Sequence, residues 1–142
     1  MSDHQGKAVL HRSDDAHSGW GSLSERPGEI ASIEVPLTTL DSFLETQRIE
    51  QVDLLKVDVE GSEIELLRGA RRSLERHVFR HLFIEFNGVL LAERGLGPAE
   101  FLAPLEAAGY KLWPAHVGLV ERMRSGADPA HTVWANLLFS AP

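Results

Sequence analysis

The spacing of apolar residues changes in the middle of the chain. Val52–Val59 is a short, nearly continuous apolar run that ends in acidic residues and Gly61. Such a run is typical of a strand covered on both faces. From Glu60 to about Arg76 the apolar residues recur at helical spacing, and Glu63 lies off this stripe, which consists of Ile64, Leu67, Ala70 and Leu74. The pattern predicts a strand, a tight acidic turn and a helix.

The second half of the chain repeats this alternation. His81–Phe86 is another buried-type strand, and Gly97-Pro98 opens a helical pattern that reaches Gly109, with Pro104 expected to shorten or kink it. Two further strands are predicted at Tyr110–Trp113 and Thr132–Ser140. Trp113 and Trp134 are expected in the core. The residues between these strands include Gly118, Gly126 and Pro129 and are expected to form a loop.

The first third of the chain is more polar and favours a hairpin and loops. Lys7–Arg12 and Ile30–Val35 have β-strand patterns, and Thr38–Asp41 fits a capping box that begins a short helix. Because strands and helices alternate through the remainder, we expect a single α/β domain over residues 1–142 with a mainly parallel sheet.

Composition excludes several classes of protein. The 142 residues are 43% hydrophobic and 25% charged, as in ordinary globular domains, and the net charge of −7 disfavours nucleic acid as a partner. The chain has no cysteine, so it has neither disulfides nor thiolate metal sites. It contains no apolar run of about 18 residues and no apolar signal core, so we expect no membrane span and a cytoplasmic location.

Acidic and amide side chains gather where the two central strands end. Asp58, Glu60 and Glu63 follow the first strand, and Glu85 and Asn87 end the second. Parallel strands bind ligands at their carboxyl ends, where converging carboxylates can hold a hard divalent cation or act as a general base. Glu60 and Glu63 also suit the first turn of a helix, where negative charge is favourable without any ligand. Both roles stay open for that pair.

Other candidate residues have weaker patterns. Trp20 lies between two glycines in a polar loop, which fits either a residue that covers a ligand or a local anchor, and His17 is close to it. His77 and His81 have the spacing of zinc ligands but lack the intervening glutamate of the usual motif and straddle a helix-to-strand turn. Five arginines between residues 68 and 80 are expected on a solvated helix face.

Several segments together resemble the FkbM family of S-adenosylmethionine-dependent methyltransferases. The resemblance is carried by Val52-Asp53-Leu54-Leu55-Lys56-Val57-Asp58-Val59-Glu60-Gly61-Ser62-Glu63, by Leu67-Arg68-Gly69-Ala70 and by Leu82-Phe83-Ile84-Glu85-Phe86-Asn87. Further similar segments are Ser2–Gly6, Ser18–Ser22 and Pro36–Ser42. They extend the resemblance over essentially the whole chain.

The resemblance implies part of a Rossmann-like class I methyltransferase sheet, with mainly parallel strands and an antiparallel C-terminal strand. It implies S-adenosylmethionine as cofactor, a hydroxyl of a small molecule or sugar as acceptor, and a divalent metal as an optional second cofactor. Asp58 and Glu85 would be catalytic, and Ser2, Asp3 and Asp58 would bind the cofactor. Trp20, Glu60, Glu63 and Asn87 would contact the substrate.

The chain also departs from the family pattern. The glycine-rich turn after the first strand and the acid after the second are expected upstream of Ser2, so we expect a truncated start or a half that needs a partner. The missing first strand would be the neighbour of Val52–Val59, which leaves an apolar edge. Two alternatives therefore stay open: a non-catalytic module that pairs with a second copy or an N-terminal half through this edge, and a divalent-metal hydrolase using Asp58, Glu60 and Glu85.

Overall fold

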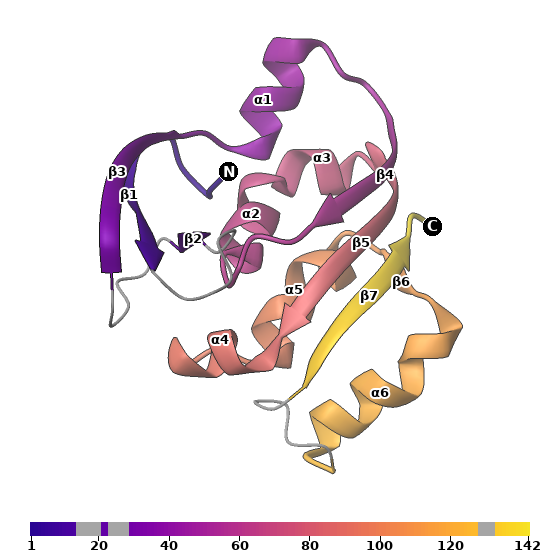
Figure 1. Ribbon diagram of the computed structural model, residues 1–142. Helices are drawn as coiled ribbons and strands as arrows, with labels where there is room; N and C mark the ends of the chain where they lie inside the picture. Colours follow the sequence, from indigo (N-terminus) through magenta and orange to yellow (C-terminus); the bar gives the residue numbers. More distant parts are fainter. Residues whose placement is uncertain (14–20, 23–28, 128–132) are drawn as a thin grey trace.

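The computed structural model describes residues 1–13, 21–22, 29–127 and 133–142, which form two sheets and the helices around them (Figure 1). The smaller sheet has the order β2-β1-β3, with β1 at Gly6–Ser13, β2 at Gly21–Ser22 and β3 at Glu29–Leu37. β1 pairs with β3 in antiparallel register, with Ala8 opposite Val35. The predicted hairpin is thus confirmed.

The larger sheet carries the central pattern of the sequence. Its order is β4-β5-β7-β6, with β4 at Val52–Val57, β5 at Phe79–Asn87, β6 at Lys111–Leu112 and β7 at Trp134–Ser140. β4 and β5 are parallel, and β7 runs antiparallel to both β5 and β6. β4, β5 and β6 therefore run in one direction and the C-terminal strand β7 runs in the other, as expected for part of a Rossmann-like methyltransferase sheet.

β4 lies at one edge of this sheet as far as the structure describes it. Leu54, in the middle of the strand, is 57% exposed. The expectation of a strand covered on both faces was therefore wrong, whereas the expected apolar edge is present. The first expectation failed because an apolar run shows that a strand can be buried on both faces, but it does not show which elements cover those faces.

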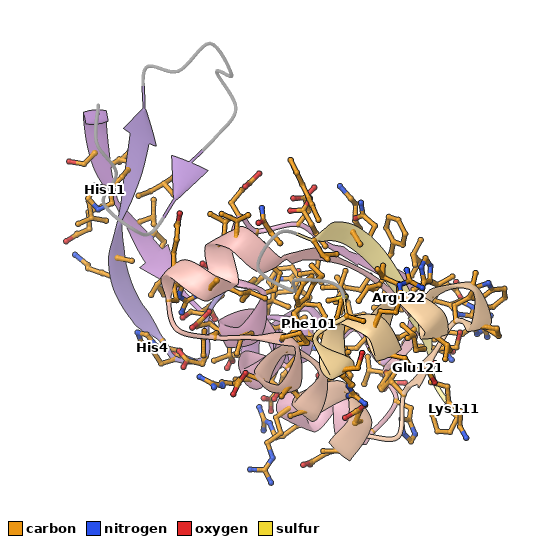
Figure 2. All side chains as sticks on the ribbon, turned by 90° about the horizontal axis from the view of Figure 1, so that it is seen from below. His4, His11, Phe101, Lys111, Glu121 and Arg122 are labelled. Atoms are coloured by element: carbon orange, nitrogen blue, oxygen red, sulfur yellow. The ribbon has the colours of Figure 1, made fainter. Side chains whose placement is uncertain are left out.

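Helices pack on one face of the larger sheet and build the core. Side chains alternate between the two faces of each strand, and those on the helix side are buried, such as Leu82, Ile84 and Phe86 of β5. Phe86 meets Phe101 edge to face, with ring centroids 5.1 Å apart. Seen from below, Phe101 lies among the side chains of the interior, whereas His11 marks the small sheet, which extends away from the main body (Figure 2). The helices are α1 at Leu40–Gln47, α2 at Glu63–Gly69, α3 at Arg71–Glu75, α4 at Gly88–Glu93, α5 at Pro98–Ala107 and α6 at Pro114–Ser125.

Several helix predictions need correction. The helix expected from Glu60 to Arg76 is split at Ala70 into α2 and α3, although its predicted apolar stripe is buried. The helix after Gly97 continues across Pro104 to Ala107. The loop expected around Gly118 is instead α6, which begins with Pro114 and ends at Gly126 in the left-handed conformation. None of the helices in the described ranges is long and apolar enough to span a membrane.

Candidate functional site

The parallel pairing of β4 and β5 brings the two predicted strand ends together. Val57 lies opposite Ile84 in the register, so Asp58 and Glu85 follow side by side at the carboxyl edge of the sheet. A single carboxylate oxygen from each of Asp58, Glu60 and Glu85 lies within 4.8 Å of the others. We call these three residues the acidic cluster. The convergence of acidic side chains expected at the two strand ends is thus present.

Glu85 is the buried member of the acidic cluster. Its side chain is only 6% exposed, and the indole Nε1 of Trp134 donates a hydrogen bond to its Oε1. Its Oε2 is buried and has no hydrogen-bond partner within the part of the chain that the structure describes. Asp58 is more open, and its Oδ2 accepts a hydrogen bond of 2.7 Å from Lys56 Nζ.

The turn between β4 and α2 positions Glu60 through an unusual backbone. Glu60 and Gly61 both have positive φ, at 51° and 95°. A left-handed conformation is unfavourable for a residue with a Cβ, so surrounding contacts must hold Glu60 there. The guanidinium of Arg94 donates to the Gly61 carbonyl oxygen and to the Glu65 carboxylate, which fixes the turn from the side of α4.

Glu63 supports the same turn from inside. Its Oε1 accepts hydrogen bonds of 3.2 Å from the backbone N–H groups of Val59 and Gly61. The side chain is fully buried, so the expectation that Glu63 lies off the buried stripe was wrong. A carboxylate can be buried when backbone donors satisfy it, and here one oxygen is satisfied while Oε2 has no partner among the described residues. Its predicted contact with substrate stays a prediction.

Electrostatics favour proton uptake at Glu85. Burial raises the pKa of this carboxyl group; the hydrogen bond from Trp134 opposes the shift, and the charges of Asp58, Glu60 and Glu63 add to it. The hydrogen bond with Asp58 and the charge of Asp58 raise the pKa of Lys56, so this ammonium stays charged. The cluster therefore combines a carboxylate with raised proton affinity and a second carboxylate paired with a cation, which suits general-base chemistry.

The other predicted site residues have different positions. Asn87 ends β5 and caps α4, because its Oδ1 accepts a hydrogen bond of 3.2 Å from Leu90 N.

Ser2 lies near the opposite end of α2. It is buried, its backbone N donates to Thr38 O, and its own carbonyl packs against Gly69, the last residue of α2. Glu63 begins that helix, so Ser2 contacts the end of α2 away from the acidic cluster. Trp20 and His17 lie outside the described residues.

Asp3 and the paired histidines each have local partners. Asp3 Oδ1 lies 2.6 Å from His4 Nδ1 and 3.2 Å from Ser2 Oγ. The hydrogen bond with His4 is the main cause that lowers the pKa of Asp3, so this carboxylate is ionised at neutral pH. His77 Nε2 contacts Ala108 O, whereas His81 Nδ1 contacts Ser140 Oγ, and the two histidines do not share a site.

Trp134 is a site residue that the sequence reasoning missed. It was expected in the core, as was Trp113, but the two side chains are 61% and 48% exposed. Strand alternation in β7 gives the reason, because Leu137 and Phe139 face the core and Trp134 therefore faces the opposite side, opposite Asn87 in the register. The same alternation, read from the sequence, would have placed Trp134 on the face of the acidic cluster.

Comparison with known proteins assigns the family. No curated protein and no solved structure matches the chain significantly. The profile of the methyltransferase FkbM domain matches residues 2–112, which include β4, β5 and all three residues of the acidic cluster. With a match over most of its length and the expected strand arrangement, the chain belongs to the FkbM methyltransferase family.

Proposed function

We propose that the chain uses S-adenosylmethionine to methylate a hydroxyl oxygen of a small molecule or sugar, with the acidic cluster at the reacting centre. The observation that carries the proposal is Glu85, a buried carboxyl group beside Asp58 with a raised pKa and an oxygen that has no partner among the described residues. A hydroxyl must lose its proton to attack a methyl group, and a carboxylate of raised proton affinity is suited to accept that proton near neutral pH.

The donor set fits the charge of this cofactor. Its sulfonium and amino groups are cationic, and the cluster supplies three carboxylates with Lys56 as a partly compensating ammonium. Asp3, kept ionised by its contact with His4, can accept hydrogen bonds from an adenine amino group or a ribose hydroxyl. We assign Asp58 to the methyl-donor end of the cofactor and Ser2 and Asp3, which lie apart from the acidic cluster, to its adenine end. Trp20, Glu60, Glu63 and Asn87 are assigned to the acceptor side.

Each residue of the cluster has a distinct task in the proposed reaction. When bound, S-adenosylmethionine supplies a methyl carbon whose bond to sulfur breaks, with the electron pair going to sulfur, as the acceptor oxygen bonds to that carbon. Glu85 takes the acceptor proton on Oε2, while Trp134 holds its other oxygen in place. Asp58, held by its hydrogen bond from Lys56, orients the acceptor hydroxyl. Proximity and orientation provide most of the acceleration.

Methyl transfer from labelled S-adenosylmethionine to a panel of sugars and other hydroxyl compounds tests the proposal. Removal of a general base lowers rates by about 10²–10⁴-fold, so Glu85→Gln should lower kcat by this factor. Its affinity for S-adenosylhomocysteine, measured by calorimetry, should change little. Glu75→Gln is the matched control, because Glu75 is exposed and pairs only with Arg71 in the described contacts. Native transfer by a folded Glu85→Gln chain would exclude Glu85 as the base.

A second candidate function rests on the edge of the larger sheet. Leu54 is exposed, and the outer edge of β4 has no neighbouring strand within the described ranges. Both features suit a module that pairs with another chain, either a second copy or an N-terminal half, and does not catalyse. Calorimetry separates the two candidates. Binding of S-adenosylhomocysteine by the chain supports the enzyme, whereas a folded chain that binds none of it favours the pairing module.

A further inference from the structure

We propose that the acidic cluster binds one hard divalent cation of the Mg²⁺, Mn²⁺ or Ca²⁺ class through Asp58, Glu60 and Glu85. The proposal deepens the proposed function because it concerns the same site. It rests on four properties of the described residues: the spacing of the three carboxylates, a buried oxygen without a partner, the balance of charge and the chemistry of the donors.

The spacing fits ligands around a single ion. One carboxylate oxygen from each of the three residues lies within 4.8 Å of the other two. Oxygen ligands lie about 2.3–2.6 Å from Ca²⁺ and about 2.0–2.1 Å from Mg²⁺, so two oxygens on opposite sides of one ion are about 4.0–5.2 Å apart. Three carboxylates fill about half of a six-coordinate shell, which leaves positions for water or substrate oxygens.

Glu85 provides the second, independent observation. More than nine-tenths of its side chain is buried, and Oε2 has no hydrogen-bond partner in the described part of the structure. Buried carboxylate oxygens are normally paired with a donor or a cation. Its other oxygen accepts the hydrogen bond from Trp134, and outer partners of this kind commonly orient metal-ligating carboxylates. Glu85 is thus held in the cluster with Oε2, which has no partner among the described residues, able to coordinate an ion. With an ion bound, Oε2 would hold the ion in place of taking the acceptor proton.

The charge around the cluster also favours a cation. Glu63, fully buried behind the turn, is a fourth carboxylate close enough for its charge to act on Glu85. Lys56 binds Asp58 through Oδ2, which leaves Oδ1 for another ligand. The guanidinium of Arg94 donates to the Gly61 carbonyl oxygen and to Glu65. A divalent ion would offset the remaining negative charge.

The donor chemistry selects the class of ion. All three candidate ligands are carboxylates, and carboxylates together with water suit Mg²⁺, Ca²⁺ and Mn²⁺. Zinc prefers thiolate and imidazole ligands. The chain contains no cysteine, and His77 and His81 contact Ala108 and Ser140 respectively. We therefore expect Mn²⁺, which electron paramagnetic resonance detects, to serve as a probe that Mg²⁺ or Ca²⁺ displaces.

Titration of the native chain with Mn²⁺, without cofactor or acceptor, tests the site directly. We expect one saturable ion per chain and an affinity at least tenfold weaker in each of Asp58→Asn, Glu60→Gln and Glu85→Gln. Glu75→Gln should bind as the native chain does. Circular dichroism of each variant shows whether it is folded. No saturable binding, or unchanged affinity in folded Asp58→Asn and Glu60→Gln chains, would overturn the proposal.

The same samples separate this proposal from the proposed function. If Mn²⁺ does not bind and methyl transfer continues in chelator, the cation site fails and the methyltransferase reaction stands. If Mn²⁺ binds as expected but no S-adenosylmethionine-dependent transfer occurs, the site stands and the proposed function fails. In that case metal-dependent hydrolysis by the same three carboxylates becomes the reaction to assay.

Discussion

Tyr110 is the one tyrosine of the chain, and its hydroxyl donates a hydrogen bond of 2.7 Å to Phe79 O. Burial raises the pKa of Tyr110 to about 12. The unfolded chain has a tyrosine pKa of about 10, so this group stabilises the fold fully below pH 10. That contribution is lost as the pH rises from about 10 through about 12. Because there is a single tyrosine, the ultraviolet absorbance of tyrosinate reports this group alone.

Absorbance titration and denaturant unfolding check this prediction together. Tyr110→Phe should lower the free energy of unfolding at neutral pH by about 0.5–1.5 kcal/mol, the usual contribution of a hydrogen bond. It should also remove most of the fall in stability between pH 10 and pH 12. Half-ionisation of Tyr110 near pH 10, while circular dichroism still shows a native fold, would contradict the assignment.

Gly61 carries a backbone requirement next to the acidic cluster. Its φ is 95°, and a Cβ at this position would lie 3.3 Å from Leu90 Cβ. Gly95 has φ of 69°, but a Cβ there would meet nothing within 4 Å. Left-handed backbone costs a residue with a side chain about 1–2 kcal/mol, so Gly95→Ala should destabilise by that amount. Gly61→Ala should destabilise more, because it adds the contact with Leu90.

Thermal or denaturant unfolding of both glycine variants measures the difference. Gly61→Ala should also weaken Mn²⁺ binding, since displacement of the turn moves Glu60, whereas Gly95→Ala should bind Mn²⁺ normally. Equal stability of the two variants would show that the Leu90 side chain gives way at no cost and that only the backbone conformation matters.

At the scale of elements, Asp41 explains how α3 can begin after the break at Ala70. Ala70 offers no side-chain cap, but Asp41 of α1 accepts hydrogen bonds from Arg72 N, Ser73 N and Ser73 Oγ at 2.9, 2.9 and 2.6 Å. The carboxylate therefore caps α3 from a neighbouring helix, in the way that an ordinary cap serves its own helix. This cap between helices could not be predicted from local spacing.

Replacement of Asp41 should destabilise the fold in a pH-dependent way. Burial would raise the pKa of Asp41, but the hydrogen bonds from Ser73 and Arg72 lower it overall. Its contribution is therefore present above the unfolded pKa of about 3.9 and is lost as the pH falls through the lower folded value. Asp41→Ala should cost about 0.5–2 kcal/mol at pH 7, as lost caps do, and less in acid.

Denaturant unfolding at several pH values checks the Asp41 prediction. Glu45→Ala is the matched control on the same helix, because Glu45 is exposed and contacts Arg72 at 3.4 Å. Exposed ion pairs contribute about 0–1 kcal/mol, so this variant should differ little from the native chain. The capping role would be excluded if Asp41→Ala lowered the free energy of unfolding as little as Glu45→Ala does, or by the same amount at every pH.

The elements that sequence patterns predicted are those that local periodicity determines. β1, β3, β4 and β5 follow apolar spacing, and Thr39 caps α1 one residue after the Thr38 that begins the predicted capping box. α6 was missed because Gly118 and sparse apolar positions hide the helical period, and its buried residues are Val120 and Met123. The split at Ala70 and the burial of Glu63 depend on contacts with other elements, which spacing does not contain.

At the scale of the molecule, one face of the larger sheet carries the chemistry. Strand alternation and register place Leu54, Glu85 and Trp134 on the face opposite the buried residues Leu82, Ile84 and Leu137. The strand-end rule located Asp58 and Glu85 because it depends only on parallel order. It could not show that Trp134 contacts Glu85, because that contact requires β7 to lie next to β5.

The edge of β4 tests whether this face is completed by another chain. Val52 N donates to Val78 O, so the polar backbone groups of Val52 point toward β5 and those of Asp53 point away from it. Proline at an edge position whose N–H points outward is tolerated within a sheet but blocks a further strand. Asp53→Pro should therefore fold and lose pairing through this edge. Asp53→Ala is the control. Like Asp53→Pro, it removes the 3.0 Å ion pair with Arg80, but it keeps the backbone N–H donor.

Sedimentation over a range of concentrations distinguishes the two variants. If two copies pair through β4, the native chain and Asp53→Ala should associate, and Asp53→Pro should require at least tenfold higher concentration to do so. Association that is equal in all three chains would assign self-pairing to another surface. A native chain that stays monomeric at every concentration would exclude a second copy as the partner at β4. The exposed Leu54 and the outward-pointing backbone groups would then have to serve a different partner chain.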